Sequence, residues 1–357
     1  MNDVSLLIIA GGKSSRLGRD KRFVEIGGVG LLESMLRKAS ARNFAEIFLC
    51  VDRQTPEIKS LSDAFNATIL LDEISAAGPA AGLSNGLRKI SSDWALAVSI
   101  DMPFFDFAAF EPIFDDQHKI IIPRVGGRLQ PLAAFYHRST ADAFEKNLSA
   151  WQKKLRATID RLPHRIIDLD VDENIFFNVN TRADLHLALG RAENLSRPTP
   201  IVSIVAPSSG TGKTTFIERL TKIFSDQNIK IGVIKSDAHG FNLDVEGKDS
   251  WRFQRAGADA VAVVSPHGWF LTQRTDERAD FFTVADKMTG VDLILTESRT
   301  RKIFPTVSLW RGLGDKIVDE KICAVFSSAP EASDEIAEFH LDDLKSAEAI
   351  IKFLAGT

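Results

Sequence analysis

The stretch that decides the fold is residues 4–21, VSLLIIAGGKSSRLGRDK. Its first seven residues are almost all apolar, which is typical of a β-strand covered on both faces. Gly11 and Gly12 follow directly, and glycine lets the backbone approach an anion closely and direct its free N–H groups toward it. Arg16 and Lys21 add cations suited to triphosphate oxygens. The stretch therefore predicts a strand followed by a phosphate-binding loop.

Similar apolar runs recur along the first half of the chain and alternate with helical patterns. They are VSLLIIA (4–10), EIFLCV (46–51), ATILL (67–71), WALAVSI (94–100), KIIIP (119–123) and AAFY (133–136). Short β-rich runs that alternate with helices are typical of a mostly parallel sheet with helices on both faces. We therefore expect an α/β, doubly wound, three-layer domain.

The alternation stops at RAENLSRPTP (191–200), a polar segment with two prolines and no apolar periodicity, which predicts a linker. A second alternation then begins. It consists of IVSIVA (201–206), IKIGVI (229–234), ADAVAVV (258–264), VDLILT (291–296) and KICAVF (321–326), and ends with a predicted helix, LKSAEAIIKFLA (344–355). We therefore expect two doubly wound domains, 1–190 and 201–357, each large enough to fold by itself.

The bulk composition restricts the classes of partner. The 357 residues are 44% hydrophobic and 26% charged, and the net charge of −4 gives no reason to expect a nucleic acid or an anionic membrane as partner. The two cysteines, Cys50 and Cys323, lie one in each half and form no disulfide framework, which favours a reducing compartment. The first apolar run is too short for a signal peptide or a membrane span. We expect a cytoplasmic protein.

The second decisive stretch is IVSIVAPSSGTGKTT (201–215). A strand, a glycine-bearing loop and a helical sequence follow one another, which is the context of a P-loop. Backbone N–H groups and the helix N-terminus would hold the β-phosphate, Lys213 would reach the β- and γ-phosphates, and the Thr214 hydroxyl would bind Mg²⁺. Pro207 stands where the full pattern has its first glycine. The predicted nucleotide-binding residues are Ser209, Gly210, Thr211, Gly212, Lys213, Thr214 and Thr215.

The string AGGKSSRLGRDK (10–21) resembles the nucleotidyltransferases that activate sugars and cofactors from an NTP, above all the molybdenum cofactor guanylyltransferase (MobA) family. The resemblance covers about residues 4–190. Further segments that carry it are Asp72, GPAAG (78–82), IDMP (100–103), Gln130 with Pro131, and FNVNT (177–181). It implies a Rossmann-like, GT-A-like domain. Cys50 departs from the family, which often has asparagine there.

The resemblance also implies roles for these residues. The implied catalytic residues are Arg16, Lys21 and Asp101. The implied nucleotide-binding residues are Ile9, Ala10, Gly11, Gly12, Lys21, Asp72, Gly78, Gly82 and Asp101, and Gln130, Asn178 and Asn180 would lie near the acceptor. Asp101, at the end of a predicted strand, could hold Mg²⁺, which usually takes one or two carboxylates together with phosphate oxygens and water.

The second half resembles the small GTP-binding partner of that enzyme, the MobB family, over about residues 200–310. The segments that carry this resemblance are IKSDAH (234–239), GKDSWR (247–252), AGA (256–258) and LILTE (293–297). Ser236 replaces a family histidine and Ser298 a glycine. Glu297 or Asp237 could orient Mg²⁺ or water, whereas His239 and the pair Asp249 and Arg252 could equally be surface residues.

Together the resemblances imply GMP transfer from Mg·GTP to the molybdopterin cofactor, giving molybdopterin guanine dinucleotide and pyrophosphate, with a fused GTP-binding adapter domain. Molybdoenzymes or cofactor-insertion proteins are the implied partners. A cytidylyltransferase on the same acceptor and a sugar-phosphate nucleotidyltransferase are alternatives, and the attached adapter-like domain disfavours sugars. A non-catalytic scaffold that binds the molybdenum cofactor is a further alternative, against which the intact Arg16, Lys21 and Asp101 speak.

Overall fold

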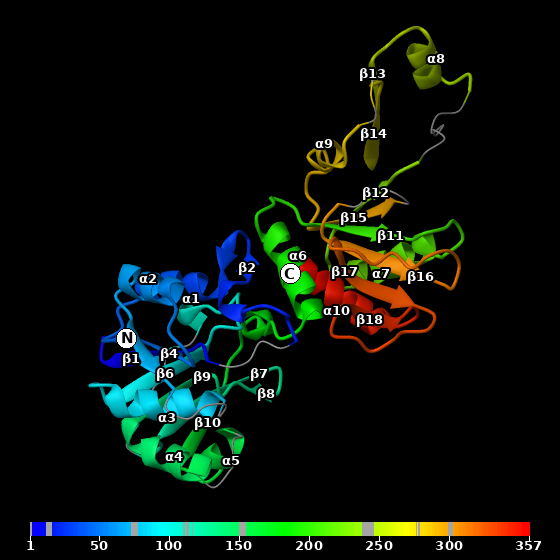
Figure 1. The fold of residues 1–357 in the computed structure, drawn as a ribbon. Helices are drawn as coiled ribbons and strands as arrows, with labels where there is room; N and C mark the ends of the chain where they lie inside the picture. The colour runs from blue at the N-terminus through cyan, green and yellow to red at the C-terminus, as the bar shows by residue number, and fades with distance from the viewer. Residues whose placement is uncertain are drawn as a thin grey trace. The chain divides into compact units, whose positions relative to one another are not determined.

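A computed structural model shows the fold of the chain (Figure 1). It describes residues 2–11, 16–72, 78–109, 111, 114–115, 117–149, 155–237, 246–275, 277, 279–298 and 303–357. The chain divides into two compact units, 1–189 and 190–357. Each unit is built around its own sheet.

The sheet of the first unit has the strand order β10-β7-β9-β6-β1-β4-β5, with β8 paired to β7. Its strands are β1 Val4–Ile9, β4 Ile47–Val51, β5 Thr68–Leu71, β6 Trp94–Ser99, β7 Ile120–Val125, β8 Arg128–Leu129, β9 Ala133–His137 and β10 His164–Asp168. The six predicted strands are confirmed. β1 pairs parallel with β4 and β6, whereas β9 runs antiparallel to β6 and β7, so the sheet is mixed.

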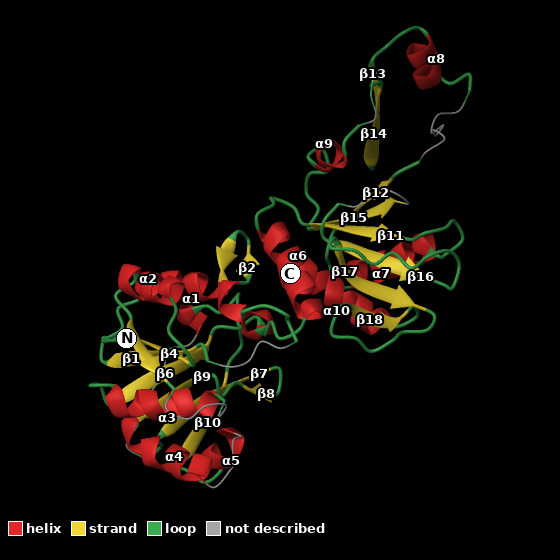
Figure 2. Cartoon of the chain, in the orientation of Figure 1, coloured by secondary structure: helices red, strands yellow, loops and turns green. Residues whose placement is uncertain are grey.

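Helices cover both faces of this sheet (Figure 2). They are α1 Leu31–Ser40, α2 Pro56–Ala64, α3 Pro79–Lys89, α4 Ala141–Ser149 and α5 Leu155–Ile159. The start of α6 Arg182–Leu195 packs in a separate cluster with Leu17, Val24 and Leu31. The small pair β2 Glu25–Ile26 and β3 Val29–Gly30 precedes α1. Leu6 and Ile8 of β1 pack in one core with Leu32 of α1, and Leu7 and Ile9 pack in another with Leu83 of α3. Because successive strand residues point to opposite faces, this alternation produces three layers.

The second unit has a six-stranded sheet in the order β12-β15-β11-β16-β17-β18, and each of these neighbouring pairs is parallel. The strands are β11 Ile201–Val205, β12 Ile231–Lys235, β15 Leu293–Ser298, β16 Thr306–Trp310, β17 Ile322–Ser327 and β18 Ala337–His340. The helices are α7 Lys213–Asp226, α8 Asp249–Arg255, α9 Phe281–Ala285 and α10 Leu344–Ala355. The predicted α/β class is confirmed for both units, as is the last helix.

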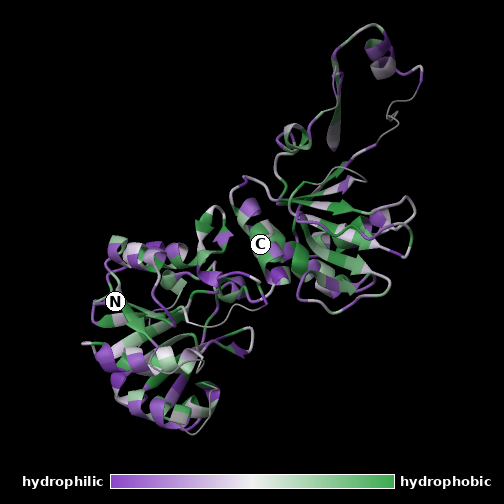
Figure 3. Cartoon of the chain, in the orientation of Figure 1, coloured by the Kyte–Doolittle hydropathy of each residue, from purple (hydrophilic) through white to green (hydrophobic). Residues whose placement is uncertain are grey.

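One predicted strand lies outside this sheet. The run ADAVAVV contributes β13 Ala260–Ser265, which pairs antiparallel with β14 Gly268–Gln273 in a separate two-stranded ribbon. Val264 is 80% exposed and Trp269 is 65% exposed, so the expectation of a covered sheet strand is wrong here. Figure 3 shows the hydropathy of this segment. Because only two residues separate β13 from β14, the chain forms a hairpin and β13 pairs with β14 instead of with the sheet.

The predicted linker 191–200 is partly helical, because α6 continues to Leu195. Arg191 and Asn194 are 4% and 2% exposed. Arg191 donates from Nη1 to the carbonyl of Phe353 at 2.8 Å, and Asn194 donates from Nδ2 to that of Leu354 at 2.9 Å. The Phe353 carbonyl also accepts from the Gly356 N–H at 3.2 Å, whereas the Leu354 carbonyl lies in the last turn of α10, where no further helical N–H follows. Polar side chains therefore complete the end of α10 from a segment whose composition suggests a loop.

Among the residues that the structure describes, no helix combines the length and the apolar character that crossing a bilayer requires.

Candidate nucleotide-binding sites

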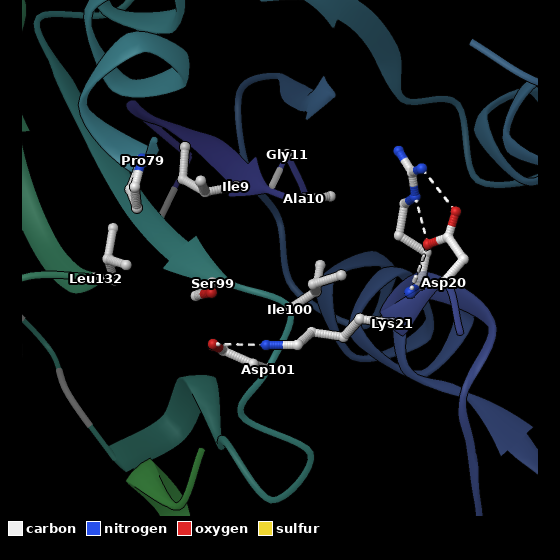
Figure 4. A pocket seen from close by; sticks show the side chains of 11 residues that line it. Ile9, Ala10, Gly11, Asp20, Lys21, Pro79, Ser99, Ile100, Asp101 and Leu132 are labelled. Carbon is white, nitrogen blue, oxygen red and sulfur yellow. Dashed lines mark hydrogen bonds and ion pairs between the residues drawn. The ribbon is translucent and has the colours of Figure 1, made fainter. Parts of the chain in front are cut away.

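A cavity in the first unit opens where β1 and β6 end (Figure 4). The residues that line it are Ile9, Ala10, Gly11, Asp20, Lys21, Arg22, Pro79, Ser99, Ile100, Asp101 and Leu132. β1 and β6 are parallel neighbours with Ile9 opposite Ser99, so the residues that follow each strand meet at one edge of the sheet. The structure thus brings the predicted residues Gly11, Lys21 and Asp101 to one wall.

Lys21 and Asp101 form an ion pair within this cavity, which Figure 4 shows as a dashed line. The Lys21 Nζ lies 3.3 Å from the Asp101 Oδ2 and 2.8 Å from the Asn180 Oδ1. The backbone N–H of Val179 donates to the Asp101 carbonyl at 2.8 Å, so the segment that contains Asn180 is attached to the same loop. The predicted cation Lys21 therefore contacts both the predicted carboxylate Asp101 and the predicted acceptor-side amide of Asn180.

The free oxygen of Asp101 fits a metal ligand. Asp101 Oδ1 is buried and has no hydrogen-bond partner among the described residues. A buried carboxylate oxygen without a partner is costly, and Mg²⁺ prefers such hard oxygen ligands. Asp101 would bind this ion through Oδ1, while its Oδ2 stays paired with Lys21.

Asp72 lies beside two of the predicted glycines. A Cβ atom on Gly11 would lie 2.6 Å from the Asp72 Oδ2, and a Cβ on Gly82 would lie 3.3 Å from the Asp72 Oδ1. Burial, together with the nearby charge of Asp52, raises the pKa of Asp72 to about 6. A side chain at Gly11 would force the Asp72 carboxyl group to move, and one at Gly82 would crowd it.

Cys50, the position that departs from the family, is 1% exposed. Its Cβ would lie 3.1 Å from a Cβ on Gly82, so the thiol belongs to the packing beneath α3. Burial and the charge of Asp72 raise the pKa of the Cys50 thiol, which keeps it neutral. The side chain is a small apolar filler in this structure.

Gly78 begins α3 with a φ of +74°, a conformation that favours glycine. Pro79 follows as the first helical residue and lines the cavity. Proline is suited to this position because its missing N–H has no partner in the first turn of a helix. The N-terminus of α3 therefore faces the site, where its free N–H groups favour an anion.

Arg22 is a site residue that the sequence analysis missed. It is 3% exposed, and it donates from Nε and Nη2 to the two oxygens of Asp20 at 2.9 and 2.7 Å and from Nη1 to Asp52 Oδ1 at 2.8 Å. Burial by itself raises the pKa of Asp20, but the hydrogen bonds from Arg22 outweigh it and lower the pKa. A charged residue after a loop is usually exposed, so the sequence gives no signal for this network.

The three predicted acceptor residues differ in how they connect to the cavity. Asn180 contacts Lys21, as described, whereas Asn178 donates from Nδ2 to the Phe176 carbonyl at 2.7 Å. Gln130 precedes Pro131, whose carbonyl accepts a hydrogen bond of 2.6 Å from the buried Tyr136 hydroxyl. This bond holds the turn, and its next residue, Leu132, lines the cavity.

Among the described residues, the cavity lining does not include the predicted Arg16, Asp72, Gly78, Gly82, Gln130, Asn178 and Asn180. Arg16 is exposed and makes no hydrogen bond or ion pair with another residue that the structure describes. Gly12 lies outside the described residues.

The second site lies where β11 ends and α7 begins. Gly212 precedes α7 with a φ of +98°, and the Lys213 Nζ donates to the Ser208 carbonyl at 3.3 Å. The Thr214 hydroxyl lies 3.1 Å from each carboxylate oxygen of Glu297. Glu297 is placed there because β15 pairs with β11 in parallel. The predicted metal pair, Thr214 and Glu297, is therefore assembled beside the P-loop, and its oxygens suit Mg²⁺.

The remaining candidates of the second unit divide between site and surface. Ser236 donates its backbone N–H to the Glu297 carbonyl at 2.9 Å, which brings the adjacent Asp237 near the same strand end. Asp249 and Arg252 lie 3.8 Å apart and are 84% and 70% exposed, so they form a surface pair. His239 lies outside the described residues.

The fold and the two sites define an α/β protein with a nucleotidyltransferase-type cavity and a separate P-loop. Residues 6–166 match the family described as the MobA-like NTP transferase domain, and residues 201–328 match the molybdopterin guanine dinucleotide synthesis protein B family. The chain belongs to the molybdenum cofactor guanylyltransferase family in its first part and to the MobB adapter family in its second. It is an enzyme of the nucleotidyltransferase class.

Individual relatives support both assignments. A "Probable molybdenum cofactor guanylyltransferase" from Pelotomaculum thermopropionicum is 30% identical over 202 residues, which cover 53% of this chain and 93% of that protein. Another of the same name from Natronomonas pharaonis is 28% identical over 200 residues, covering 54% and 99%. A "Molybdopterin-guanine dinucleotide biosynthesis adapter protein" from Haemophilus influenzae is 30% identical over 141 residues, covering 38% and 79%.

Proposed function

We propose that the first unit transfers GMP from Mg·GTP to the molybdopterin cofactor and releases pyrophosphate, which gives molybdopterin guanine dinucleotide. The observation that carries this proposal is the cavity in which the Gly11 loop, Lys21 and the unpartnered oxygen of Asp101 meet. The names of the relatives agree with this reaction. The names also favour guanine as the base.

The chemistry requires two polyanions to be brought together. A phosphate oxygen of the acceptor attacks the α-phosphorus of GTP, and the bond to the leaving pyrophosphate breaks. The attacking phosphate is already ionised, so no general base is needed, and positioning and charge neutralisation account for most of the rate. Asp101 would hold Mg²⁺, which neutralises phosphate oxygens when bound. Lys21, with Arg16 from the adjoining loop, would offset the charge of the pyrophosphate.

The acceptor would bind where Asn180 and the turn at Gln130 adjoin the cavity through Lys21 and Leu132, with Asn178 two residues from Asn180. Asn180 already contacts Lys21, so the acceptor phosphate would enter beside the cation that neutralises the nucleotide. The nucleotide would then occupy the side formed by Gly11, Asp72 and the start of α3. The α-phosphorus of GTP would then lie near Asp101, facing the acceptor phosphate.

Substitution of Asp101 tests the proposal. We expect Asp101→Asn to lower pyrophosphate release with GTP and molybdopterin cofactor about 100- to 1,000-fold, because the ligand for Mg²⁺ loses its charge. Asp63→Asn is the matched control, since Asp63 is an exposed partner of Lys59 in the same unit. Full activity of Asp101→Asn would contradict the assigned role.

The same assay with other nucleotides separates the alternative functions. Release with CTP and not GTP would assign a cytidylyltransferase, and release with a sugar phosphate as acceptor would assign a sugar-phosphate nucleotidyltransferase. Binding of the molybdenum cofactor without release from any NTP would assign a scaffold.

For the second unit we propose that the P-loop binds Mg·GTP as an adapter, with Lys213 on the phosphates and the pair Thr214 and Glu297 at the metal. The product would pass to molybdoenzymes or cofactor-insertion proteins. Both units lie in one chain, so the covalent link raises the concentration of each site near the other.

A further inference from the structure

A turn after β16 lies next to the P-loop of the second unit. This segment, residues 310–316, reads WRGLGDK. β16 pairs with β11 on the side opposite to β15, and both strands end at the edge of the sheet where the P-loop begins. The turn therefore flanks the P-loop on the side away from the metal pair, Thr214 and Glu297.

The turn approaches the P-loop at two points. A Cβ atom on Gly212 would lie 3.3 Å from the Arg311 Nη2. A Cβ atom on Gly314 would lie 3.4 Å from the Cβ of Pro207. The second contact involves the proline that replaces the first glycine of the usual P-loop pattern. The turn thus lies against both ends of the phosphate-binding segment.

Interactions on its outer side hold the turn in place. The Trp310 indole donates from Nε1 to the Gly314 carbonyl at 3.0 Å. The Lys316 Nζ lies 5.0 Å from the centre of the Trp310 ring and 2.8 Å from the Glu338 Oε1. The Glu338 side chain is only 3% exposed, so this ion pair is a fixed anchor. A side chain carried by such a turn is positioned before a ligand arrives, which reduces the entropy lost on binding.

Lys316 is paired with Glu338, so the charged side chains of this turn that pair with no described residue are Asp315 and Arg311, and only Arg311 is a cation. It is exposed, and it makes no hydrogen bond or ion pair with any residue in the part of the chain that the structure describes. A guanidinium group suits phosphate oxygens because its N–H groups form a planar fork.

We propose that Arg311 is a second phosphate-binding cation of the P-loop site, opposite Thr214 and Glu297 and additional to Lys213. The proposal rests on GTP binding by the second unit. A bound oligophosphate would then be held between the metal on the β15 side and the guanidinium on the β16 side. Contacts with more than one phosphate would make Arg311 distinguish GTP from GMP.

Calorimetric titration of the full-length chain tests this proposal. All proteins, including the parent, carry Lys21→Ala, which weakens GTP binding at the first site. The GTP binding that is lost when Lys213→Ala is added to the parent is assigned to the second site. We expect Arg311→Ala to weaken this binding of GTP about 10- to 100-fold, the usual cost of losing a charge-assisted hydrogen bond. Binding of GMP should change less than that of GTP, and Arg311→Lys should retain part of the affinity.

Lys321→Ala is the matched control, because it also removes one positive charge. Lys321 is exposed and directly precedes β17, at the edge of the sheet opposite to the edge that carries the P-loop. It should bind GTP as the parent does, and an unchanged melting temperature of Arg311→Ala would exclude loss of folding. Parent-like GTP affinity of Arg311→Ala, or an equal loss in Lys321→Ala, would overturn the role of Arg311. If the parent shows no binding that depends on Lys213, GTP binding by the second unit is itself wrong and the role of Arg311 falls with it.

Discussion

At the scale of single residues, most carboxylates of the candidate transfer site have a cationic partner, and Asp72 does not. Arg22 neutralises Asp20 and Asp52 from a buried position, and Lys21 balances one oxygen of Asp101. Asp72 has no such partner, since its Oδ1 is buried without a hydrogen bond to a described residue. An unpartnered carboxyl group between two glycines costs stability that ligand contacts could recover.

Asp72 should therefore make stability depend on pH. Its pKa is raised from the ordinary 3.8 to about 6, so the folded chain binds more protons than the unfolded chain between these values. Stability consequently falls as the pH rises from about 4 to about 6, and the full cost is present above about pH 6. We expect Asp72→Asn to raise the free energy of unfolding at pH 8 by about 1 kcal/mol, a value reduced for partial exposure, and by little near pH 4.

Urea unfolding at both pH values measures this difference. Asp63→Asn serves again as the exposed control and should give the same small change at both. An equal effect of Asp72→Asn at pH 4 and pH 8 would show that the carboxyl group titrates normally.

At the scale of elements, α1 supports the loop that carries Asp101. Lys38 donates from Nζ to the carbonyls of Pro103 at 2.5 Å and Phe105 at 3.1 Å. Burial lowers the pKa of Lys38, against a smaller opposite effect of Asp106. The helix therefore fixes the backbone just beyond Asp101, and small displacements of a catalytic group are costly to rate.

Lys38→Met should loosen this loop while its side chain still fills the space. We expect transfer activity to fall about tenfold and the Mg²⁺ concentration required for half-maximal rate to rise, because Asp101 is held less well. Pyrophosphate release over a Mg²⁺ titration measures both quantities. Lys59→Met on α2, an exposed lysine paired with Asp63, is the control. An unchanged Mg²⁺ dependence would show that α1 does not position the loop.

At the scale of the whole molecule, the division into two compact units falls between Leu189 and Gly190, within α6. The end of α6 belongs to the second unit, where Asn194 Oδ1 also accepts from the backbone N–H of Ile201 at 3.0 Å. Gly190 packs so tightly that a Cβ would lie 2.7 Å from the Cys323 sulfur. We propose that a functional second domain begins with this helix.

A fragment 182–357 should accordingly be more stable than a fragment 201–357. The shorter fragment loses the hydrogen bonds of Arg191 and Asn194 to the end of α10, and two buried polar contacts cost about 2–5 kcal/mol. Thermal melting of the two fragments measures the difference. Asn194→Ala in the full-length chain should reproduce part of the loss, and equal melting temperatures of the fragments would favour the boundary at residue 201.

The sequence by itself determined most sheet strands of the two units and the two glycine-bearing loops, whereas β8, β10, β16 and β18 were not predicted. Apolar runs and glycines act through the local backbone, so VSLLIIAGG and SGTGKTT indicate a strand exit without knowledge of the partners. Gly11 and Asp101 lie at one cavity because β1 and β6 are parallel neighbours and end at the same edge of the sheet. The pairing of Thr214 with Glu297 follows the same rule.

Only the tertiary structure decided where isolated charges and one apolar run belong. Arg22 and Arg191 are buried because carboxylates or carbonyls from distant segments surround them, and Arg311 lies beside Gly212 because its turn folds onto the P-loop. The strand 260–265 pairs in a hairpin and not in the sheet. Such outcomes depend on contacts between residues far apart in the chain, and composition and periodicity carry no record of those contacts.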